Sequence, residues 1–365
     1  MVSNMRSVYI HIPFCKSICS YCDFCKMIYS ESWADTYLDE LSVEIDKYYE
    51  GDEVNTVYIG GGTPSSLNSN QLIKLFDIIK SKFNLEHLKE FTFEMNVNDI
   101  NIELCNILKS NGINRVSVGV ESFDEFNLKF LNRKHNKKEI INNIKLLKSY
   151  GFNINVDLIY ALPTETFSTF KSDLNKIIKL DVNHISTYSL IIEENTMLYK
   201  NNIKSIDEEL DYKMYDYVCK KLKSKRYNHY EVSNFAKEGY ESIHNLTYWN
   251  NSEYYGFGLG ASGYINGVRY DNTRSLNKYI NHEYRLNEIV VSKKEDMENE
   301  LILGLRKLSG INIYNFYEKF SENIQDVFNI KDAVLNGLLK IEGNYLMIPE
   351  DKIYIMNEII NSIIK

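Results

Sequence analysis

The stretch HIPFCKSICSYCDFC, from His11 to Cys25, decides how the rest of the chain is interpreted, because it holds four of the six cysteines. Cys15, Cys19 and Cys22 form a C-x3-C-x2-C pattern directly after the apolar, β-branched run SVYIHI. Thiols this close together suit a zinc ion, a disulfide, a redox pair or an iron–sulfur cluster. The surroundings of the motif must discriminate between these four uses.

Outward from this stretch, short apolar runs alternate with longer segments whose apolar residues recur at i, i+3 and i+4. The expected strands are Ser7–Ile12, Val54–Gly60, Glu90–Asn96, Asn114–Val120, Asn153–Tyr160 and His184–Leu190. Helical patterns between or after them include Trp33–Tyr49, Asn70–Phe83 and Asp207–Lys223. Six strand–helix units in a row predict parallel strands joined by right-handed crossovers.

The fold class expected from this pattern is α/β, with an open, partial (β/α)6 barrel. A closed eight-unit barrel is usually longer than this segment, and a doubly wound sheet is the structural alternative. After about Tyr227 the pattern breaks: YEVSNFA predicts one more strand, and the following stretch, as far as about Tyr284, reads as a loop. From Ser292 helical patterns return, with a hairpin at EGNYLMIP and a last helix, which suggests a small winged-helix-like module. The expected division is 1–232 for the barrel, 233–290 for a connecting segment and 291–365 for the C-terminal helical module.

Composition and charge narrow the class of protein. The chain is 44% hydrophobic and 25% charged, which is ordinary for a soluble globular protein. Its net charge of -8 argues against a nucleic-acid partner. No apolar run approaches a transmembrane length, and Asn4 and Arg6 interrupt any signal-peptide core. We therefore expect a cytoplasmic protein, in which thiols stay reduced and a disulfide is disfavoured.

The remaining uses of the cysteines differ in the number of ligands that they need. A structural zinc needs four, and Cys25 or His11 is available as the fourth, but no second CxxC occurs elsewhere. A redox pair of Cys19 and Cys22 leaves Cys15 unexplained. Three thiolates on a [4Fe–4S] cluster leave one iron open for a small ligand. This spacing after a strand resembles the signature of the radical S-adenosylmethionine (SAM) superfamily.

Further motifs extend the resemblance over nearly the whole chain. GGGTPSSL follows the second expected strand and EMN ends the third; alone, they read as a glycine–proline turn and a solvated carboxylate. The motifs that carry the resemblance are YIHIPFC, YCDF, GGGTPS, RVSVGVESF, LNR, DLIYALP, YEVSNFA and HNLTYW. Together they are similar to the family of coproporphyrinogen dehydrogenases and their HemW-type relatives. The resemblance implies a partial radical SAM barrel with a small C-terminal helical module.

The resemblance also implies cofactors and the residues that hold them. Cys15, Cys19 and Cys22 would hold the cluster. Tyr9, Gly61 and Glu94 match positions that contact the cluster-bound SAM. Positions that contact a second SAM in the dehydrogenase branch are matched by Tyr21, Gly62, Thr63, Glu121, Arg133 and Asp157. In such proteins an electron from the cluster cleaves SAM to a 5′-deoxyadenosyl radical, while the protein supplies orientation and a dry pocket.

Two departures bear on the branch of the family. The dehydrogenase branch carries a fourth cysteine where this chain has Phe24, within the YCDF run typical of HemW-type proteins. Cys25 follows one residue later, and we interpret it as a nearby thiol, because a fourth thiolate would block the open iron. Glu121 stands where both branches usually have Gln, so it adds a negative charge and changes the hydrogen-bonding pattern at the second SAM position.

The segment SIHNLTYW, from Ser242 to Trp249, points to a further ligand. Alone, it reads as a polar loop with an aromatic anchor. Histidine is a common axial ligand of haem, and Tyr and Trp offer flat apolar surfaces. HemW-type chaperones carry an HNxxYW stretch associated with haem binding, and the matching residues here are His244, Asn245, Tyr248 and Trp249. The family's GAHS-like continuation appears here as GASG, residues 260–263, without its histidine.

Three hypotheses follow. The first, favoured by YCDF and HNLTYW, is a haem chaperone that keeps a SAM-binding cluster, binds haem and passes it to apo-haemoproteins at the inner face of the membrane. The alternative is an enzyme that oxidatively decarboxylates the propionates of coproporphyrinogen III to vinyl groups. A third is another radical SAM enzyme that acts on haem, such as a ring-opening methyltransferase. Each requires an electron donor for the cluster, and whether the protein is an enzyme stays open.

Overall fold

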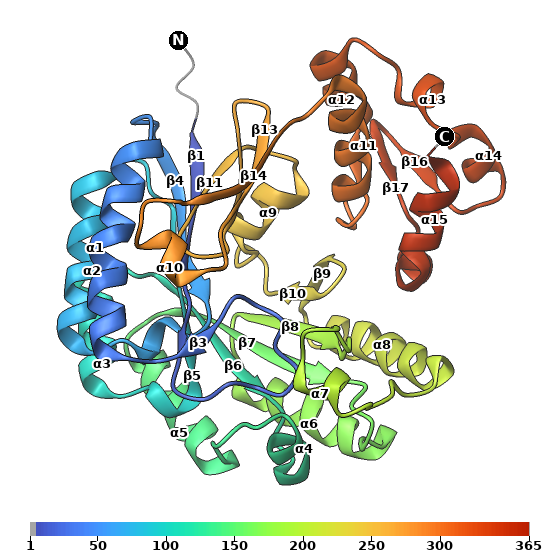
Figure 1. Cartoon of the computed structure of the whole chain (residues 1–365). Coiled ribbons are helices and arrows are strands. Elements are labelled where there is room, and N and C mark those ends of the chain that lie inside the picture. Colours follow the sequence, from blue (N-terminus) through green and yellow to red (C-terminus); the bar gives the residue numbers. More distant parts are fainter. Residues whose placement is uncertain (1–4, 365) are drawn as a thin grey trace.

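The computed structural model describes residues 5–364 and is built on one 12-stranded mixed sheet (Figure 1). Its strand order is β14-β13-β12-β11-β1-β4-β5-β6-β7-β8-β10-β9. The central strands are β1 (Arg6–Ile12), β4 (Val54–Gly61), β5 (Glu90–Asn96), β6 (Arg115–Glu121), β7 (Asn153–Tyr160) and β8 (His184–Ser189). All neighbours in this set pair in parallel, and each strand lies within one residue of its predicted bounds. The predicted α/β fold of parallel strand–helix units is confirmed.

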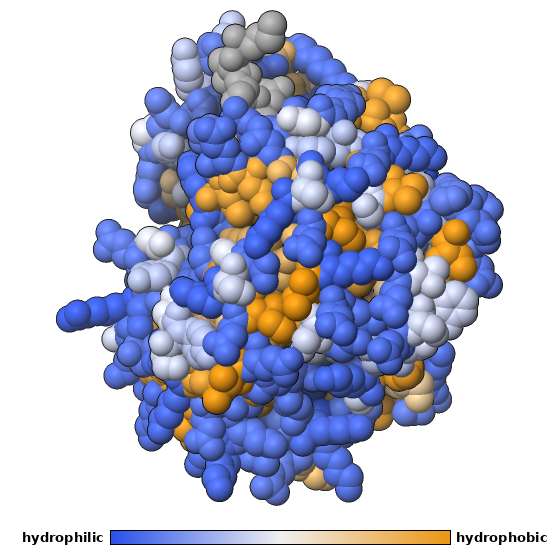
Figure 2. Space-filling model, turned by 90° about the vertical axis from the view of Figure 1, so that its left-hand side faces the viewer, coloured by the Kyte–Doolittle hydropathy of each residue, from blue (hydrophilic) through white to orange (hydrophobic). Residues whose placement is uncertain are grey.

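Helices alternate with the parallel strands along the chain. They are α1 (Glu31–Tyr48), α2 (Ser69–Lys82), α3 (Ile102–Ser110), α4 (Glu125–Phe130), α5 (Lys137–Ser149), α6 (Phe167–Leu180), α7 (Met197–Lys200) and α8 (Glu208–Lys223). Capping boxes start α2 and α5, where Asn68 and Asn136 accept backbone N–H bonds and a Gln or Glu three residues into the helix reciprocates. Figure 2 shows the side formed by the first helices, which is largely hydrophilic with scattered apolar patches.

The alternation of side chains along the strands separates the core from the interior of the barrel. In β1, Val8, Ile10 and Ile12 are fully buried in the main hydrophobic core. The alternate residues Tyr9 and His11 line a cavity instead. Because successive side chains of a strand point to opposite faces, the same seven-residue strand supplies both the packing and the site.

The stretch after YEVSNFA, which was expected to be a loop as far as about Tyr284, is mostly regular structure, so that prediction was wrong. After Tyr227 the chain forms β9 (Asn228–Glu231), β10 (Asn234–Ala236), α9 (Ile243–Trp249), β11 (Tyr254–Phe257), β12 (Ser262–Ile265), β13 (Val268–Asn272), α10 (Leu276–Tyr279) and β14 (Arg285–Val290). YEVSNFA is split between β9 and β10, which pair as an antiparallel hairpin. β11 pairs in parallel with β1, and β12 to β14 continue antiparallel. These strands cover the edge of β1, and the sheet ends at β14 and β9.

The C-terminal part is helical with a small hairpin, as predicted, and lies beside the barrel (Figure 1). Its elements are α11 (Lys293–Gly304), β15 (Ile311–Asn312), α12 (Ile313–Phe320), α13 (Ile324–Val327), α14 (Ile330–Leu335), β16 (Lys340–Glu342), β17 (Tyr345–Met347), η3 (Glu350–Ile355) and α15 (Met356–Ile363). An isolated bridge between Glu231 and Lys307 joins it to β9. Across residues 5–364, no helix combines the length and apolar character that crossing a bilayer requires.

Candidate functional site

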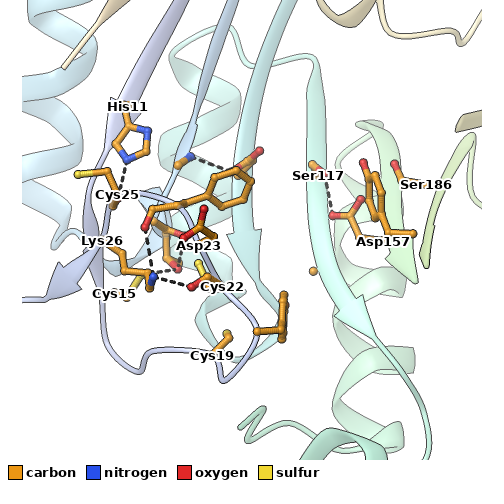
Figure 3. A pocket seen from close by; sticks show the side chains of 18 of the residues that line it. His11, Cys15, Cys19, Cys22, Asp23, Cys25, Lys26, Ser117, Asp157 and Ser186 are labelled. Carbon is orange, nitrogen blue, oxygen red and sulfur yellow. Dashed lines mark hydrogen bonds between the residues drawn. The ribbon is translucent and has the colours of Figure 1, made fainter. Parts of the chain in front are cut away.

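A cavity of about 800 Å³ lies inside the barrel and is lined by residues of β1 and β4 to β8. The short strands β2 (Phe14–Cys15) and β3 (Met27–Ile28) pair in parallel and frame the loop that carries the cysteines. Figure 3 shows this loop on one side of the cavity and Ser117, Asp157 and Ser186 on the strands opposite. In barrels of parallel strands, such loops after the strands carry the functional groups.

Three cysteine thiols of the predicted motif, Cys15, Cys19 and Cys22, line this cavity and form no disulfide. Within residues 5–364, no three His, Cys, Asp or Glu side chains converge on the position of a single metal ion. A cluster needs no such common point, because each thiolate binds a different iron. The donor set therefore fits a three-cysteine iron–sulfur cluster, with Cys15 further fixed by the Thr63 hydroxyl 3.5 Å from its sulfur.

Cys25 also lines the cavity, but its surroundings differ from those of the three motif cysteines. His11 Nε2 lies 2.7 Å from the Cys25 carbonyl oxygen, and His11 Nδ1 lies 3.0 Å from the Tyr9 hydroxyl. Burial lowers the pKa of His11 to about 4, so the ring is neutral. The Cys25 side chain packs against Gly260, where an added Cβ would lie 2.5 Å from the Cys25 Cβ. His11 and Gly260 thus fix both the backbone and the side chain of Cys25.

The glycine run after β4 holds a buried carboxylate. Glu94 accepts hydrogen bonds from the Gly61 N–H at 3.0 Å and from the Tyr58 hydroxyl at 2.6 Å. Burial raises the pKa of Glu94 above its ordinary value. Gly61 has φ of 110°, and a Cβ there would lie 2.5 Å from the His11 ring, so only glycine fits. Glycine at position 61 therefore lets the His11 ring pack directly against the backbone, while Glu94 holds the Gly61 N–H.

A second buried carboxylate, Glu121, forms an ion pair with Arg133. Glu121 ends β6 in the left-handed region, with φ of 64°. The Arg133 guanidinium also donates to Asn96 Oδ1 at 2.5 Å and to the Gly119 carbonyl oxygen at 3.3 Å. Tyr21, Gly62 and Thr63 line the same cavity. The predicted second-SAM residues are thus assembled around an arginine whose charge is already balanced.

Asp157, on β7, is the third buried carboxylate of the cavity. Its oxygens accept hydrogen bonds from Asn155 Nδ2 at 2.9 Å and from the Ser117 hydroxyl at 3.2 Å. Burial, with smaller contributions from Glu121 and Glu94, raises the pKa of Asp157 to about 7. Near neutral pH this group therefore exchanges between its charged and neutral forms.

HNLTYW forms helix α9 rather than a loop. Its first turn is capped by Glu90, whose carboxylate accepts the N–H groups of Ile243 at 2.9 Å and His244 at 3.0 Å. Asn245 and Tyr248 line the cavity that holds the cysteines. A helix that was expected to be a loop therefore brings two of the four candidate haem residues into the wall of the cavity that the cysteines also line.

The other two candidate haem residues are placed differently. His244 is fully buried, with Nδ1 2.8 Å from the Thr56 hydroxyl and Nε2 2.7 Å from the Tyr248 hydroxyl. Burial lowers the pKa of His244 to about 3. Trp249 lies 5.7 Å from the Arg306 guanidinium of the C-terminal part. Neither His244 nor Trp249 lines the cavity as described.

Sequence analysis missed several cavity residues. They are Tyr58, Arg115, Ser117, Asn155, Ser186, Tyr188 and Tyr254. A usable signal was present, since Ser117 and Asn155 are small polar residues at alternate positions of otherwise apolar strands. In a strand buried on both faces, such an interruption indicates a face that meets something other than core.

Comparisons with known proteins agree with this geometry. Residues 9–177 match the model of the radical SAM superfamily, and residues 291–350 match the HemN C-terminal domain. The heme chaperone HemW of Lactococcus lactis subsp. lactis is 41% identical, over 90% of this chain and 88% of that protein. The heme chaperone HemW of Bacillus subtilis is 39% identical, over 92% and 93% of the two chains.

Among solved structures, the coproporphyrinogen III oxidase HemN from Escherichia coli, a radical SAM enzyme, superposes with a TM-score of 0.85. It shares 20% identity, over 97% of this chain and 89% of that one, which establishes a common fold. Radical SAM proteins use a [4Fe–4S] cluster and SAM, and the three cysteines in the cavity fit that requirement. From its fold, its cysteine-lined cavity and its relatives, the chain belongs to the HemW-type family of radical SAM proteins.

Proposed function

We propose that this protein is a haem chaperone, which binds a [4Fe–4S] cluster, SAM and haem and delivers haem to apo-haemoproteins. The observation that carries the proposal is that α9 brings Asn245 and Tyr248 into the same cavity as Cys15, Cys19 and Cys22. The relatives at 41% and 39% identity are named heme chaperones. An electron donor for the cluster is a further partner that the proposal requires.

The cavity residues divide into three groups in this proposal. Cys15, Cys19 and Cys22 hold the cluster, which supplies the electron for SAM reduction when it is bound. Tyr9, Gly61 and Glu94 orient SAM, since all three line the cavity and the Glu94 carboxylate fixes the Gly61 backbone. The residues Tyr21, Gly62, Thr63, Glu121, Arg133 and Asp157 form the adjoining wall. The chain does not need to supply redox chemistry itself; it orients the ligands and excludes water.

For haem, we propose contact with Asn245 and Tyr248 directly, and with His244 only after a rearrangement. Both ring nitrogens of His244 are engaged, so its Nε2 becomes an iron ligand only if the Tyr248 hydroxyl releases it. Trp249 does not line the present cavity, so its contact with haem would also require a rearrangement. A cavity of about 800 Å³ lies within the range of sites for bulky cofactors.

We also propose a cytoplasmic location, with haem transfer at the inner face of the membrane, and the division 1–232, 233–290 and 291–365. The last boundary is supported by the HemN C-terminal domain model, which begins at residue 291. The middle segment adds β11 to β14 to the sheet of the barrel, so it is a structural extension as well as a connection.

The second candidate function is coproporphyrinogen III decarboxylation, which the fold shared with HemN favours. The test is an anaerobic incubation of reconstituted protein with SAM, a reductant and coproporphyrinogen III, followed by chromatography of the tetrapyrroles. The chaperone proposal predicts unchanged coproporphyrinogen and, in a parallel reaction with haem, transfer of intact haem to an apo-haemoprotein. Vinyl products would overturn it in favour of the decarboxylase, and a ring-opened haem product would favour the methyltransferase.

A further inference from the structure

Arg115 is a buried cation that lines the cavity, and its side chain has no hydrogen-bond or ion-pair partner among the described residues. It is the first residue of β6, is 2% exposed and has its Nε enclosed with no hydrogen bond. Among residues 5–364, no hydrogen bond or ion pair within 4.0 Å engages its guanidinium. Burying a charge without a partner costs free energy, and an anion bound next to it offsets that cost. Arg115 is therefore suited to bind an anionic ligand.

The other basic side chains of the cavity already have acceptors. Arg133 is paired with Glu121. At the cysteine loop, Lys26 donates to the Cys22 carbonyl oxygen at 2.5 Å and Arg274 donates to the Asp23 carbonyl oxygen at 2.8 Å. Arg115 is therefore the lining cation that the described residues leave free to bind a ligand.

The carboxylate of Glu90, which lies in the neighbourhood of Arg115, is committed elsewhere. It accepts from the Ser242 hydroxyl at 3.2 Å as well as from the N–H groups of Ile243 and His244. Burial disfavours the charged guanidinium, but the field of Glu90 raises the pKa of Arg115, so the group remains a cation. Glu90 thus compensates part of the charge from a distance without occupying the hydrogen-bond donors.

The backbone places Arg115 beside the start of α9. Arg115 pairs with Thr92 of β5, and Glu90, two residues earlier on the same face of β5, caps α9. The side-chain amide of Asn245, in the first turn of α9, also makes no hydrogen bond to the described residues and also lines the cavity. A guanidinium and an amide, both with free donors, therefore lie at one end of the cavity.

That end is remote from the cysteine loop. Arg115 begins β6 and Glu121 ends it, and both line the cavity. At about 3.3 Å per residue, the strand separates them by roughly 20 Å. The cavity wall therefore extends along β6 from the Glu121 end, near the cysteines, to the Arg115 end.

We propose that Arg115, assisted by Asn245, is a carboxylate-binding subsite at the end of the cavity away from the cysteines. The inference rests on the proposed function, under which the carboxylate is a propionate of haem. A guanidinium binds a carboxylate through two parallel N–H bonds, which fixes orientation as well as affinity. The propionate edge of the macrocycle then meets Arg115 and α9, while the opposite edge points toward the cysteines.

The test compares haem with haem dimethyl ester, in which both propionates are blocked. The ligands are titrated into reconstituted wild-type protein and into the Arg115→Gln, Arg115→Lys and Arg274→Gln variants. Charge-assisted hydrogen bonds predict that wild type prefers haem over the ester by about 10- to 100-fold. Arg115→Gln should abolish this preference, Arg115→Lys should keep part of it, and Arg274→Gln should keep it in full.

A purely structural role of Arg115 would weaken the acid and the ester equally, and that result would overturn the inference. So would an unchanged preference in Arg115→Gln, or a preference lost only in Arg274→Gln. If Arg115→Gln fails to fold, as judged by iron content and thermal unfolding, Asn245→Ala tests the same subsite. It should reduce the preference severalfold without removing a buried charge, and an unreduced preference would overturn the inference.

Two further outcomes separate this inference from its alternatives. If Arg115→Gln loses SAM binding but keeps the acid preference, the guanidinium serves the SAM carboxylate, and the inference is overturned while the chaperone proposal stands. If wild type binds neither haem nor its ester saturably, the proposed function and the inference both fail. Saturable haem binding with no dependence on Arg115 overturns the inference alone.

Discussion

Glu121 and Arg133 form a buried ion pair in the wall of the cavity, with their side chains 8% and 10% exposed. The Glu121 carboxylate converts a potential anion site at Arg133 into a neutral pair. Removing one partner of such a pair leaves an uncompensated buried charge. The pair therefore controls whether Arg133 is available to a second carboxylate ligand.

The first prediction concerns SAM stoichiometry. Wild-type protein with a reconstituted cluster should bind one SAM per chain, because Arg133 is neutralised in place by Glu121. Glu121→Gln should free the guanidinium and permit a second, weaker SAM. Equilibrium dialysis with labelled SAM measures both, and Glu121→Gln/Arg133→Gln serves as the matched control that should return to one. Two equivalents on wild type would contradict this account.

The second prediction concerns the cluster. Single Cys→Ser changes at Cys15, Cys19 or Cys22 should each prevent assembly of a stable [4Fe–4S] cluster, because each thiolate ligates one iron. Cys25→Ser, a matched control in the same loop, should retain it. Iron and acid-labile sulfide per chain, with the visible absorption spectrum, give the result. Loss of the cluster in Cys25→Ser alone would show that the ligand set has been misassigned.

The third prediction concerns His244. His244→Ala should lower the free energy of unfolding by about 1–3 kcal/mol, since it deletes two buried hydrogen bonds and leaves the Tyr248 hydroxyl without its partner, while the Thr56 hydroxyl keeps its bond to Ser7. Tyr248→Phe should lower the free energy of unfolding by a smaller amount, because it removes only one of these hydrogen bonds. Urea unfolding of the apo-protein measures the difference. Tyr254→Phe is a control, because its hydroxyl has no hydrogen bond within the described residues, and it should change stability by less than about 0.5 kcal/mol.

The fourth prediction concerns pH. Burial raises the pKa of Glu231 to about 7 from its ordinary 4.5, so the folded protein holds this proton more tightly than the unfolded chain. Between about pH 4.5 and 7 the unfolded chain therefore binds fewer protons, and this group's contribution to stability falls as pH rises, by up to ~1.4 kcal/mol per unit.

Glu231→Gln should remove that slope and stabilise the protein at pH 8 relative to wild type. Thermal unfolding at several pH values measures the difference between the two proteins. Because Glu231 lies at the bridge to Lys307, the effect should extend to the junction with the C-terminal part. An identical pH dependence in both proteins would show that Glu231 stays charged in the fold.

The sequence predicted the bounds of the parallel strands closely. Buried strands of a barrel are apolar runs, and in this chain glycine, asparagine or charged residues mark their ends. Val54–Gly61, for example, extends the predicted strand by one residue. The cysteine loop was found from its local spacing, whereas the glycine run was singled out only by its resemblance to the family's motif. All the predicted cluster and SAM residues line one cavity.

The region after Tyr227 was not predictable in the same way. Its strands are short: β10 has three residues and β13 has five. Their Tyr, Asn and Gly residues also obscure the alternation of apolar and polar side chains that identifies a strand. They form because β1 offers an edge to β11, which is a tertiary effect. The burial of His244 depends likewise on Thr56, 188 residues away. Such a contact cannot be predicted from the neighbouring sequence, and neither can the pairing of Glu121 with Arg133.

The most direct test of the central claim is an anaerobic haem titration of the cluster-reconstituted protein, followed through the Soret band, for wild type and Tyr248→Ala. The account predicts saturation at one haem per chain for wild type and markedly weaker binding for Tyr248→Ala, because that side chain forms part of the cavity wall on α9. Unsaturable, featureless uptake by both proteins would contradict it.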